Sequence, residues 1–210
     1  MDRRCPRSQE GSRFLMPDAL ATVWYGKFMD ILQHHESSAL LKDAAMRGQL
    51  GKWTTALTGV VCSTCDAMGW KAAAKGNLST LLPEARQEYL ALDVVAFEPV
   101  GDRRWRFPIA AIELENSRED DRVAYSLWKV LCTRTELRIV FCYRKDSAEG
   151  NTLVRHLSEQ VAQAMGIQER TRIGGETMLI VGSRNESGTF PYGFFKDWHY
   201  DMNLGRFGRA

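Results

Sequence analysis

The spacing of apolar residues divides the chain into a helical first part and a mixed second part. Between Pro17 and about Leu32, apolar residues recur every three or four positions, which predicts an amphipathic helix. The same spacing predicts helices over residues 38–47 and 54–68. Residues 17–75 are therefore expected to be mainly helical.

After Gly76 the pattern becomes typical of strands. Two segments rich in strand-forming residues, 88–97 (EYLALDVVAF) and 105–115 (WRFPIAAIELE), are separated by a polar turn and predict a β-hairpin. Alternating helices and strands are expected after it: a helix from about 117 to 134, a buried strand over 137–143 (LRIVFCY), a helix over 152–165, and strands near 178–181 and 192–198. This order indicates one α/β domain over 17–205, with helices around a mixed sheet.

Composition narrows the class of protein only a little. With 28 basic and 26 acidic residues and 44% apolar residues, the chain has the balance of an ordinary soluble globular protein, and its net charge of +2 does not oppose a nucleic-acid partner. Arginines crowd residues 1–16, which we expect to be a flexible, solvated arm; an arm that contacts phosphates is the alternative.

The cysteines and the apolar runs bear on the compartment. Five cysteines form an odd set without a disulfide framework, and the charged N-terminal stretch does not have the pattern of a signal peptide. No apolar run approaches the roughly 20 residues that a membrane helix needs. We therefore predict a cytoplasmic protein with reduced thiols and no membrane partner.

Two glutamates at the end of the second predicted strand are the first candidate for chemistry. Both faces of this strand are apolar up to Glu113, and Glu113 and Glu115 share one face because strand side chains alternate. A buried, unpaired carboxylate costs several kcal/mol, so these acids need protonation, a basic partner or a metal cation.

The predicted hairpin adds a third carboxylate. If its strands pair symmetrically about Arg103, Asp93 faces Glu113 and Ala91 faces Glu115. Asp93, Glu113 and Glu115 would then form one acidic cluster, and a one-residue slip would turn Asp93 to the other face. Mg²⁺ and Mn²⁺ favour such oxygen ligands, and no histidine or thiol nearby favours zinc. The alternative is that the acids pair with local arginines (Arg103, Arg104, Arg106) or lie at a solvated sheet end.

At these residues the sequence resembles the PD-(D/E)XK nuclease superfamily, which includes many restriction endonucleases. Its motif has an Asp on one strand and a (D/E)-x-K pair on the next, then a helix and another strand; residues 86–145 follow this order with Asp93 and Glu113-Leu114-Glu115. The resemblance implies a restriction-endonuclease-like mixed sheet flanked by helices, with a helical N-terminal part. It also implies Mg²⁺-dependent hydrolysis of DNA, with Asp93, Glu113, Glu115 and the backbone carbonyl of Leu114 as metal ligands. RNA as substrate and a homodimeric state stay open.

The sequence departs from the motif in two places. Glu115 occupies the lysine position, as in some other members, so that Glu115 would ligate metal or accept a proton. In some relatives the lysine comes from the following helix, for which Lys129 is the candidate; a helical wheel places it nearly opposite the apolar face centred on Leu127 and Leu131, which favours a solvated lysine. The strand that normally precedes the Asp-bearing one is not legible.

Two other classes of function stay open at this stage. A protein that kept the nuclease fold and lost catalysis would act as a nucleic-acid-binding or scaffold module, and the missing lysine favours it. A metal-dependent hydrolase of another phosphoester is the third reading.

Overall fold

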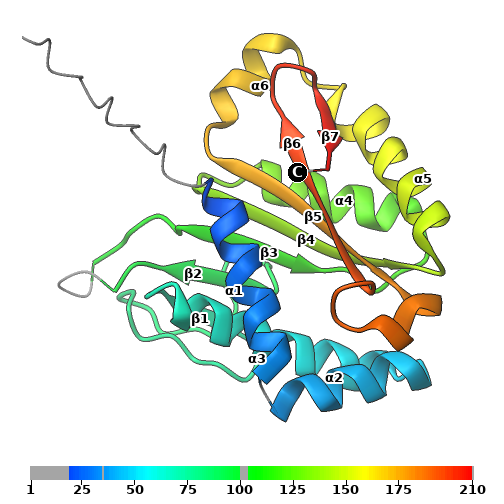
Figure 1. The fold of residues 1–210 in the computed structure, drawn as a ribbon. Coiled ribbons are helices and arrows are strands. Elements are labelled where there is room, and N and C mark those ends of the chain that lie inside the picture. Colours follow the sequence, from blue (N-terminus) through cyan, green and yellow to red (C-terminus); the bar gives the residue numbers. More distant parts are fainter. Residues whose placement is uncertain (1–18, 35, 100–103, 210) are drawn as a thin grey trace, which may run out of the picture.

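Seven strands form a single sheet in the computed structural model, which describes residues 19–34, 36–99 and 104–209 (Figure 1). Their order in the sheet is their order in the chain: β1 (Lys71–Ala74), β2 (Val94–Phe97), β3 (Ala110–Leu114), β4 (Leu137–Arg144), β5 (Glu176–Ser183), β6 (Phe195–Asp201) and β7 (Arg206–Gly208). Strands β3, β4 and β5 are parallel and the remaining neighbours pair antiparallel. The sheet is therefore mixed, as the sequence predicts.

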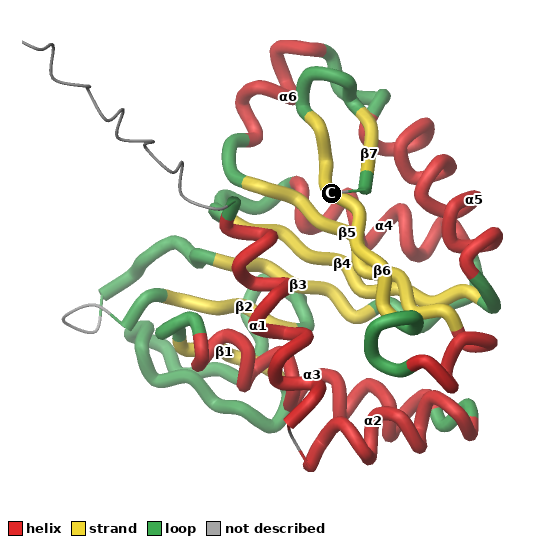
Figure 2. The backbone as a smooth tube through the Cα atoms, in the orientation of Figure 1, coloured by secondary structure: helices red, strands yellow, loops and turns green. Residues whose placement is uncertain are grey.

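Helices cover both faces of this sheet (Figure 2). Their bounds are α1 (Leu20–His34), α2 (Glu36–Arg47), α3 (Leu50–Ala67), α4 (Asp120–Leu131), α5 (Ser147–Leu157), the π-helical turn η1 (Ser158–Ala162), α6 (Ile167–Ile173) and the 3₁₀ segment η2 (Arg184–Thr189). The three N-terminal helices lie on one face, whereas α4 and α5 lie on the other and connect the parallel strands. The predicted fold class, a mixed sheet flanked by helices with a helical N-terminal part, is confirmed.

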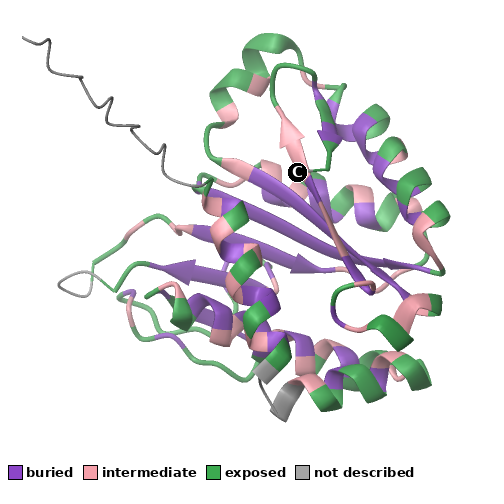
Figure 3. Ribbon diagram, viewed as in Figure 1, coloured by how far each residue is buried: buried purple, intermediate pink, exposed green. Residues whose placement is uncertain are grey.

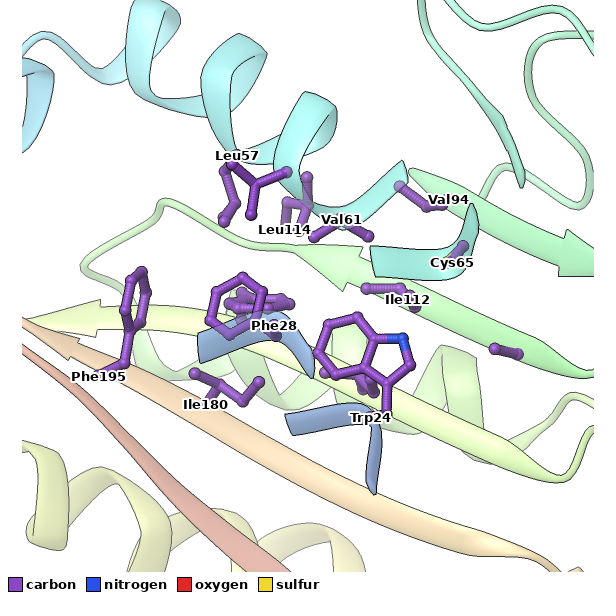
Figure 4. Close-up of a cluster of buried hydrophobic side chains, with 14 of the residues drawn as sticks. Trp24, Phe28, Leu57, Val61, Cys65, Val94, Ile112, Leu114, Ile180 and Phe195 are labelled. Atoms are coloured by element: carbon purple, nitrogen blue, oxygen red, sulfur yellow. The ribbon is translucent and has the colours of Figure 1, made fainter. Parts of the chain in front are cut away.

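The sheet separates two hydrophobic cores, and its central strands are buried on both faces (Figure 3). On one face Trp24 and Phe28 of α1 and Leu57 of α3 pack against alternate residues of the strands, such as Ile112 and Ile180 (Figure 4). The other core joins α4 and α5 to the intervening strand residues. Every residue of β3 and β4 is buried, which explains their almost continuous apolar sequences.

The register of the hairpin is the one that the sequence predicts. Val94 pairs with Ile112, Val95 with Ala111 and Ala96 with Ala110, which is the symmetric pairing about position 103. Residues 100–103 themselves lie outside the described residues, as does the predicted arm at 1–16. Continued by one residue, this register brings Asp93 opposite Glu113.

Several predicted boundaries are wrong. The strand predicted over 88–97 begins only at Val94, and the one over 105–115 is ordered as a strand only from Ala110. Residues 71–74, predicted within the helical part, form β1. This is the strand before the Asp-bearing one, which the sequence pattern does not predict. A run of alanines carries no strand-forming signal, so only its pairing with β2 makes this segment a strand.

The described residues also bear on the membrane and cysteine predictions. Within the described ranges, no helix combines the length and apolar character needed to cross a membrane. Cys62, Cys65, Cys132 and Cys142 are free thiols.

Candidate active site

Asp93 and Glu113 lie side by side where β2 begins and β3 ends. The backbone N–H of Leu114 donates a hydrogen bond to Asp93 Oδ2 at 2.8 Å, and the N–H of Asp93 donates to Glu113 Oε1 at 3.2 Å. These two bonds extend the β2–β3 pairing by one residue through side chains. The contact therefore joins the two acids that the predicted register brings together.

Glu113 is almost completely buried, with 4% of its surface exposed, and its charge is matched by a lysine from the next helix. Lys129 Nζ lies 2.8 Å from Glu113 Oε2 and donates a second hydrogen bond, also of 2.8 Å, to the carbonyl of Ala91. The basic partner of Glu113 in this contact is therefore a lysine of α4, whereas the predicted alternative is an arginine of the hairpin. Lys129 thus links β3 to the segment that leads into Asp93.

The expectation of a solvated Lys129 is wrong. The buried side of α4 consists of Val123, Ser126, Leu127 and Val130, whereas Leu131 is only half-buried. At 3.6 residues per turn, Lys129 lies roughly 110° from the centre of that side, at its flank and not opposite it. Because α4 packs on the sheet face that carries Glu113, a flanking lysine with a long stem reaches the carboxylate.

Glu115 lies on the same face but makes its own contacts. Its Oε1 accepts a 2.7 Å hydrogen bond from the Ser117 N–H, and its Oε2 lies 3.5 Å from the hydroxyl of buried Ser126. Among the described residues, no three Asp, Glu, His or Cys side chains approach closely enough to form a ready-made metal site. The structure thus joins Asp93 to Glu113 and leaves Glu115 beside them, held by two serines that sequence reasoning did not single out.

Both members of the pair are electrostatically strained as anions. Burial raises the pKa of Asp93 above its ordinary value, and the hydrogen bond from Leu114 and the charge of Lys129 oppose that rise, while Glu88 and Glu115 add to it. Burial also raises the pKa of Glu113, which Lys129 opposes and Asp93 increases. One ammonium group therefore does not fully compensate two carboxylates, and this donor set fits a hard divalent cation.

The backbone of Leu114 supplies a further oxygen on the correct side. An extended residue directs its N–H and C=O to the same neighbouring strand. Since the Leu114 N–H donates to Asp93, its carbonyl is also directed toward β2, beyond the first residue of that strand. Asp93, Glu113 and the Leu114 carbonyl are thus the groups that suit a metal ion.

A strained turn positions Asp93. Leu90 and Ala91 have φ values of 57° and 53°, in the left-handed region that non-glycine residues rarely adopt. Ala91 therefore does not face Glu115 in a strand, which corrects the sequence prediction; instead its carbonyl accepts the Lys129 hydrogen bond. Strain of this kind persists only where neighbouring contacts hold it.

No protein-family model matches the chain, and no curated protein does. Two solved structures are similar to it: NucC of E. coli MS115-1 and NucC of P. aeruginosa ATCC27853, both in a cAAA-bound form. Each alignment has 15% identity and a TM-score of 0.45, and covers 91% of this chain and 83% of the NucC chain. Similarity at this level transfers neither a residue role nor an activity to this chain.

The strained turn gives a first testable prediction. Replacing Ala91, which is exposed, by glycine is expected to raise the free energy of unfolding by about 1 kcal/mol, because glycine adopts positive φ without the Cβ clash. Urea denaturation followed by circular dichroism measures this change. The control is Ala85→Gly, at an exposed loop position without positive φ, which is expected to lower stability by about 0.5 kcal/mol. A loss of stability in Ala91→Gly would contradict the assignment of strain.

The raised pKa of Asp93 gives a second prediction. A carboxyl whose folded-state pKa is raised stabilises the fold most below the unfolded-state pKa of about 3.9, and this contribution is lost as pH rises through the folded-state value. Without divalent metal, Asp93→Asn is therefore expected to be more stable than the wild type at pH 8 and equal to it near pH 4. Mn²⁺ is expected to raise the melting temperature of the wild type at pH 8 and not that of Asp93→Asn. A melting temperature of the wild type at pH 8 that is the same with and without Mn²⁺ would argue against a metal site.

Proposed function

We propose that the protein is a Mg²⁺- or Mn²⁺-dependent nuclease that hydrolyses phosphodiester bonds of DNA. The observation that carries the proposal is the contact of Asp93 with Glu113 at the end of two paired strands, with the ammonium group of Lys129 beside them. A carboxylate pair with a lysine is the chemistry that the PD-(D/E)XK resemblance expects, here with the lysine on the following helix.

Each group has a defined role in this proposal. Asp93, Glu113 and the Leu114 carbonyl would hold the ion. A divalent ion held there supplies Lewis-acid polarisation of the phosphate and acidifies coordinated water. Lys129 stabilises the negative charge that develops on the phosphate, because its ammonium group is fixed at 2.8 Å from Glu113. Glu115, on the same face and half-buried, accepts the proton of the attacking water.

Supercoiled plasmid incubated with the protein and Mg²⁺ or Mn²⁺ tests the proposal. Nicked and linear DNA are expected with metal and not with EDTA. Hydrolysis of a small phosphodiester such as bis(4-nitrophenyl) phosphate, with intact plasmid and RNA, would instead indicate a hydrolase of another phosphoester. DNA binding without cleavage under all metal conditions would favour the non-catalytic module. The contacts of Glu115 with Ser117 and Ser126, which are separate from the Asp93–Glu113 contact, are the observation that favours this alternative.

A further inference from the structure

A cavity of about 750 Å³ lies at the carboxyl ends of the parallel strands β3, β4 and β5. It opens between the first residues of α4 and those of α5, and its charged lining consists of Arg118, Asp120, Arg144, Lys145, Glu149 and Arg184. Crevices at this end of parallel strands are the usual place for ligands in α/β sheets. The proposed nuclease chemistry does not use this cavity.

The acids in the lining are already engaged, whereas two of the arginines are not. Asp120 forms an ion pair with the buried Arg144, and Glu149 Oε2 accepts the backbone N–H of Lys145 at 3.0 Å. Arg144 also donates to the backbone carbonyls of Ser117 and Tyr143. Within the part of the chain that the structure describes, neither Arg118 nor Arg184 forms an ion pair.

The arginines are close enough to repel one another. Burial lowers the pKa of Arg184, and the positive charges of Arg118 and Arg144 lower it further. Like charges gathered in a half-buried place raise the free energy of the fold unless an anion joins them. Guanidinium groups hold phosphate through paired N–H donors, so a phosphate is the anion that suits this lining.

The cavity adjoins the candidate active site along the sheet. Arg144 follows Cys142 by two residues on β4 and shares the sheet face of Glu113 and Glu115. Since the Glu115 N–H bonds to the carbonyl of Phe141, Arg144 lies one strand over and two residues beyond Glu115. Strand spacing and rise put their backbones on the order of 8 Å apart. The floor of the cavity therefore lies beside Glu115, on the same face of the sheet as the candidate metal ligands.

We propose that the cavity formed by Arg118, Arg144 and Arg184 binds a phosphate group of the DNA substrate adjoining the phosphate that is cleaved. This inference rests on the proposed function. Arg118 and Arg184 contact the phosphate with their unpaired guanidinium groups, and Arg144, fixed by Asp120 and two carbonyls, shapes the floor of the cavity.

The test is the salt dependence of DNA binding by the full chain in EDTA, where no cleavage occurs. Fluorescence anisotropy with a labelled duplex is expected to show that Arg184→Gln raises Kd about tenfold and reduces the slope of log Kd against log salt by about 0.9, the value for one phosphate contact. Arg118→Gln is expected to act in the same direction. Arg172→Gln, on the exposed surface of α6, is the matched control and is expected to change neither quantity.

The outcomes separate the two proposals. Plasmid cleavage retained with an unchanged salt slope in both variants overturns the phosphate site and leaves the nuclease proposal standing. A reduced slope in a protein that never cleaves DNA overturns the nuclease proposal and the position beside a cleaved phosphate, and supports only a DNA-phosphate contact in the cavity. If inorganic phosphate raises the melting temperature of the wild type and not of Arg184→Gln, while DNA binding is unaffected, the ligand is a free phosphate compound and the substrate assignment is wrong. Should Arg184→Gln not fold, Arg118→Gln decides.

Discussion

Asp93→Asn and Glu113→Gln are each expected to reduce Mg²⁺-dependent plasmid cleavage by about a thousandfold or more. Each substitution removes one charged oxygen ligand with almost no change of shape, and the transition-state stabilisation supplied by a bound metal ion is worth several kcal/mol. The amide oxygen introduced by Asp93→Asn is still able to accept the Leu114 N–H, so the hairpin register should persist. Rates of conversion of supercoiled to nicked DNA, measured on gels over a range of protein concentrations, give the size of the effect.

The matched control is Glu136→Gln. Glu136 is exposed and lies directly before β4, at the end of the parallel strands opposite Glu115, so its replacement is expected to leave cleavage unchanged. Melting temperatures of all three variants separate loss of chemistry from loss of fold. Cleavage at the wild-type rate by both Asp93→Asn and Glu113→Gln would remove the metal site from the mechanism.

The fold is predictable from the sequence where apolar spacing is strong. Helix α1 and strand β4 carry continuous helical and buried-strand patterns, and both are found within a few residues of the expected bounds. Strand β1 and helix α6 are not predictable in this way, because β1 is a lysine with three alanines and α6 has no buried residue. Such segments take their form from neighbours that are distant in the sequence.

The site is predictable to the extent that it follows from strand pairing. The symmetric hairpin predicts that Asp93 meets Glu113, and the observed register bears this out because the turn lies midway between two apolar segments. The pairing of Ala91 with Glu115 fails, since the chain leaves the strand conformation at the left-handed residues before Asp93. The sequence at Leu90 and Ala91 does not predict that turn, because neither residue is a glycine.

The position of Lys129 depends on tertiary packing that a helical wheel does not contain. The wheel gives the direction of a side chain from its own helix, but not the depth at which the helix meets the sheet. A wheel centred on Leu127 and Leu131 also misplaces the buried side, because Leu131 is only half-buried whereas Ser126 and Val130 are buried. A polar residue on the apolar side of a helix, such as Ser126, is a signal that polar partners lie opposite it. Its partner is Glu115.

Lys129→Met is expected to reduce plasmid cleavage by about a hundredfold, the effect typical of removing one electrostatic contact to a reacting group. Methionine keeps the length and apolar stem of lysine and removes only the charge. The variant is also expected to be less stable without metal, because Glu113 then remains buried without a cation, and Mn²⁺ is expected to restore its melting temperature. Lys52→Met, at an exposed position of α3 on the other side of the sheet, is the control.

A second substitution distinguishes a chemical role from a structural one. Lys129→Arg keeps a positive charge beside Glu113 and leaves Glu115 in place. If the cationic group acts on the substrate, Lys129→Arg is expected to cleave at least about tenfold faster than Lys129→Met in saturating Mn²⁺. If Lys129 serves only to neutralise Glu113, Mn²⁺ at saturation would return Lys129→Met itself to the wild-type rate. Full activity of Lys129→Met in saturating Mn²⁺ would therefore confine Lys129 to the stability of the site.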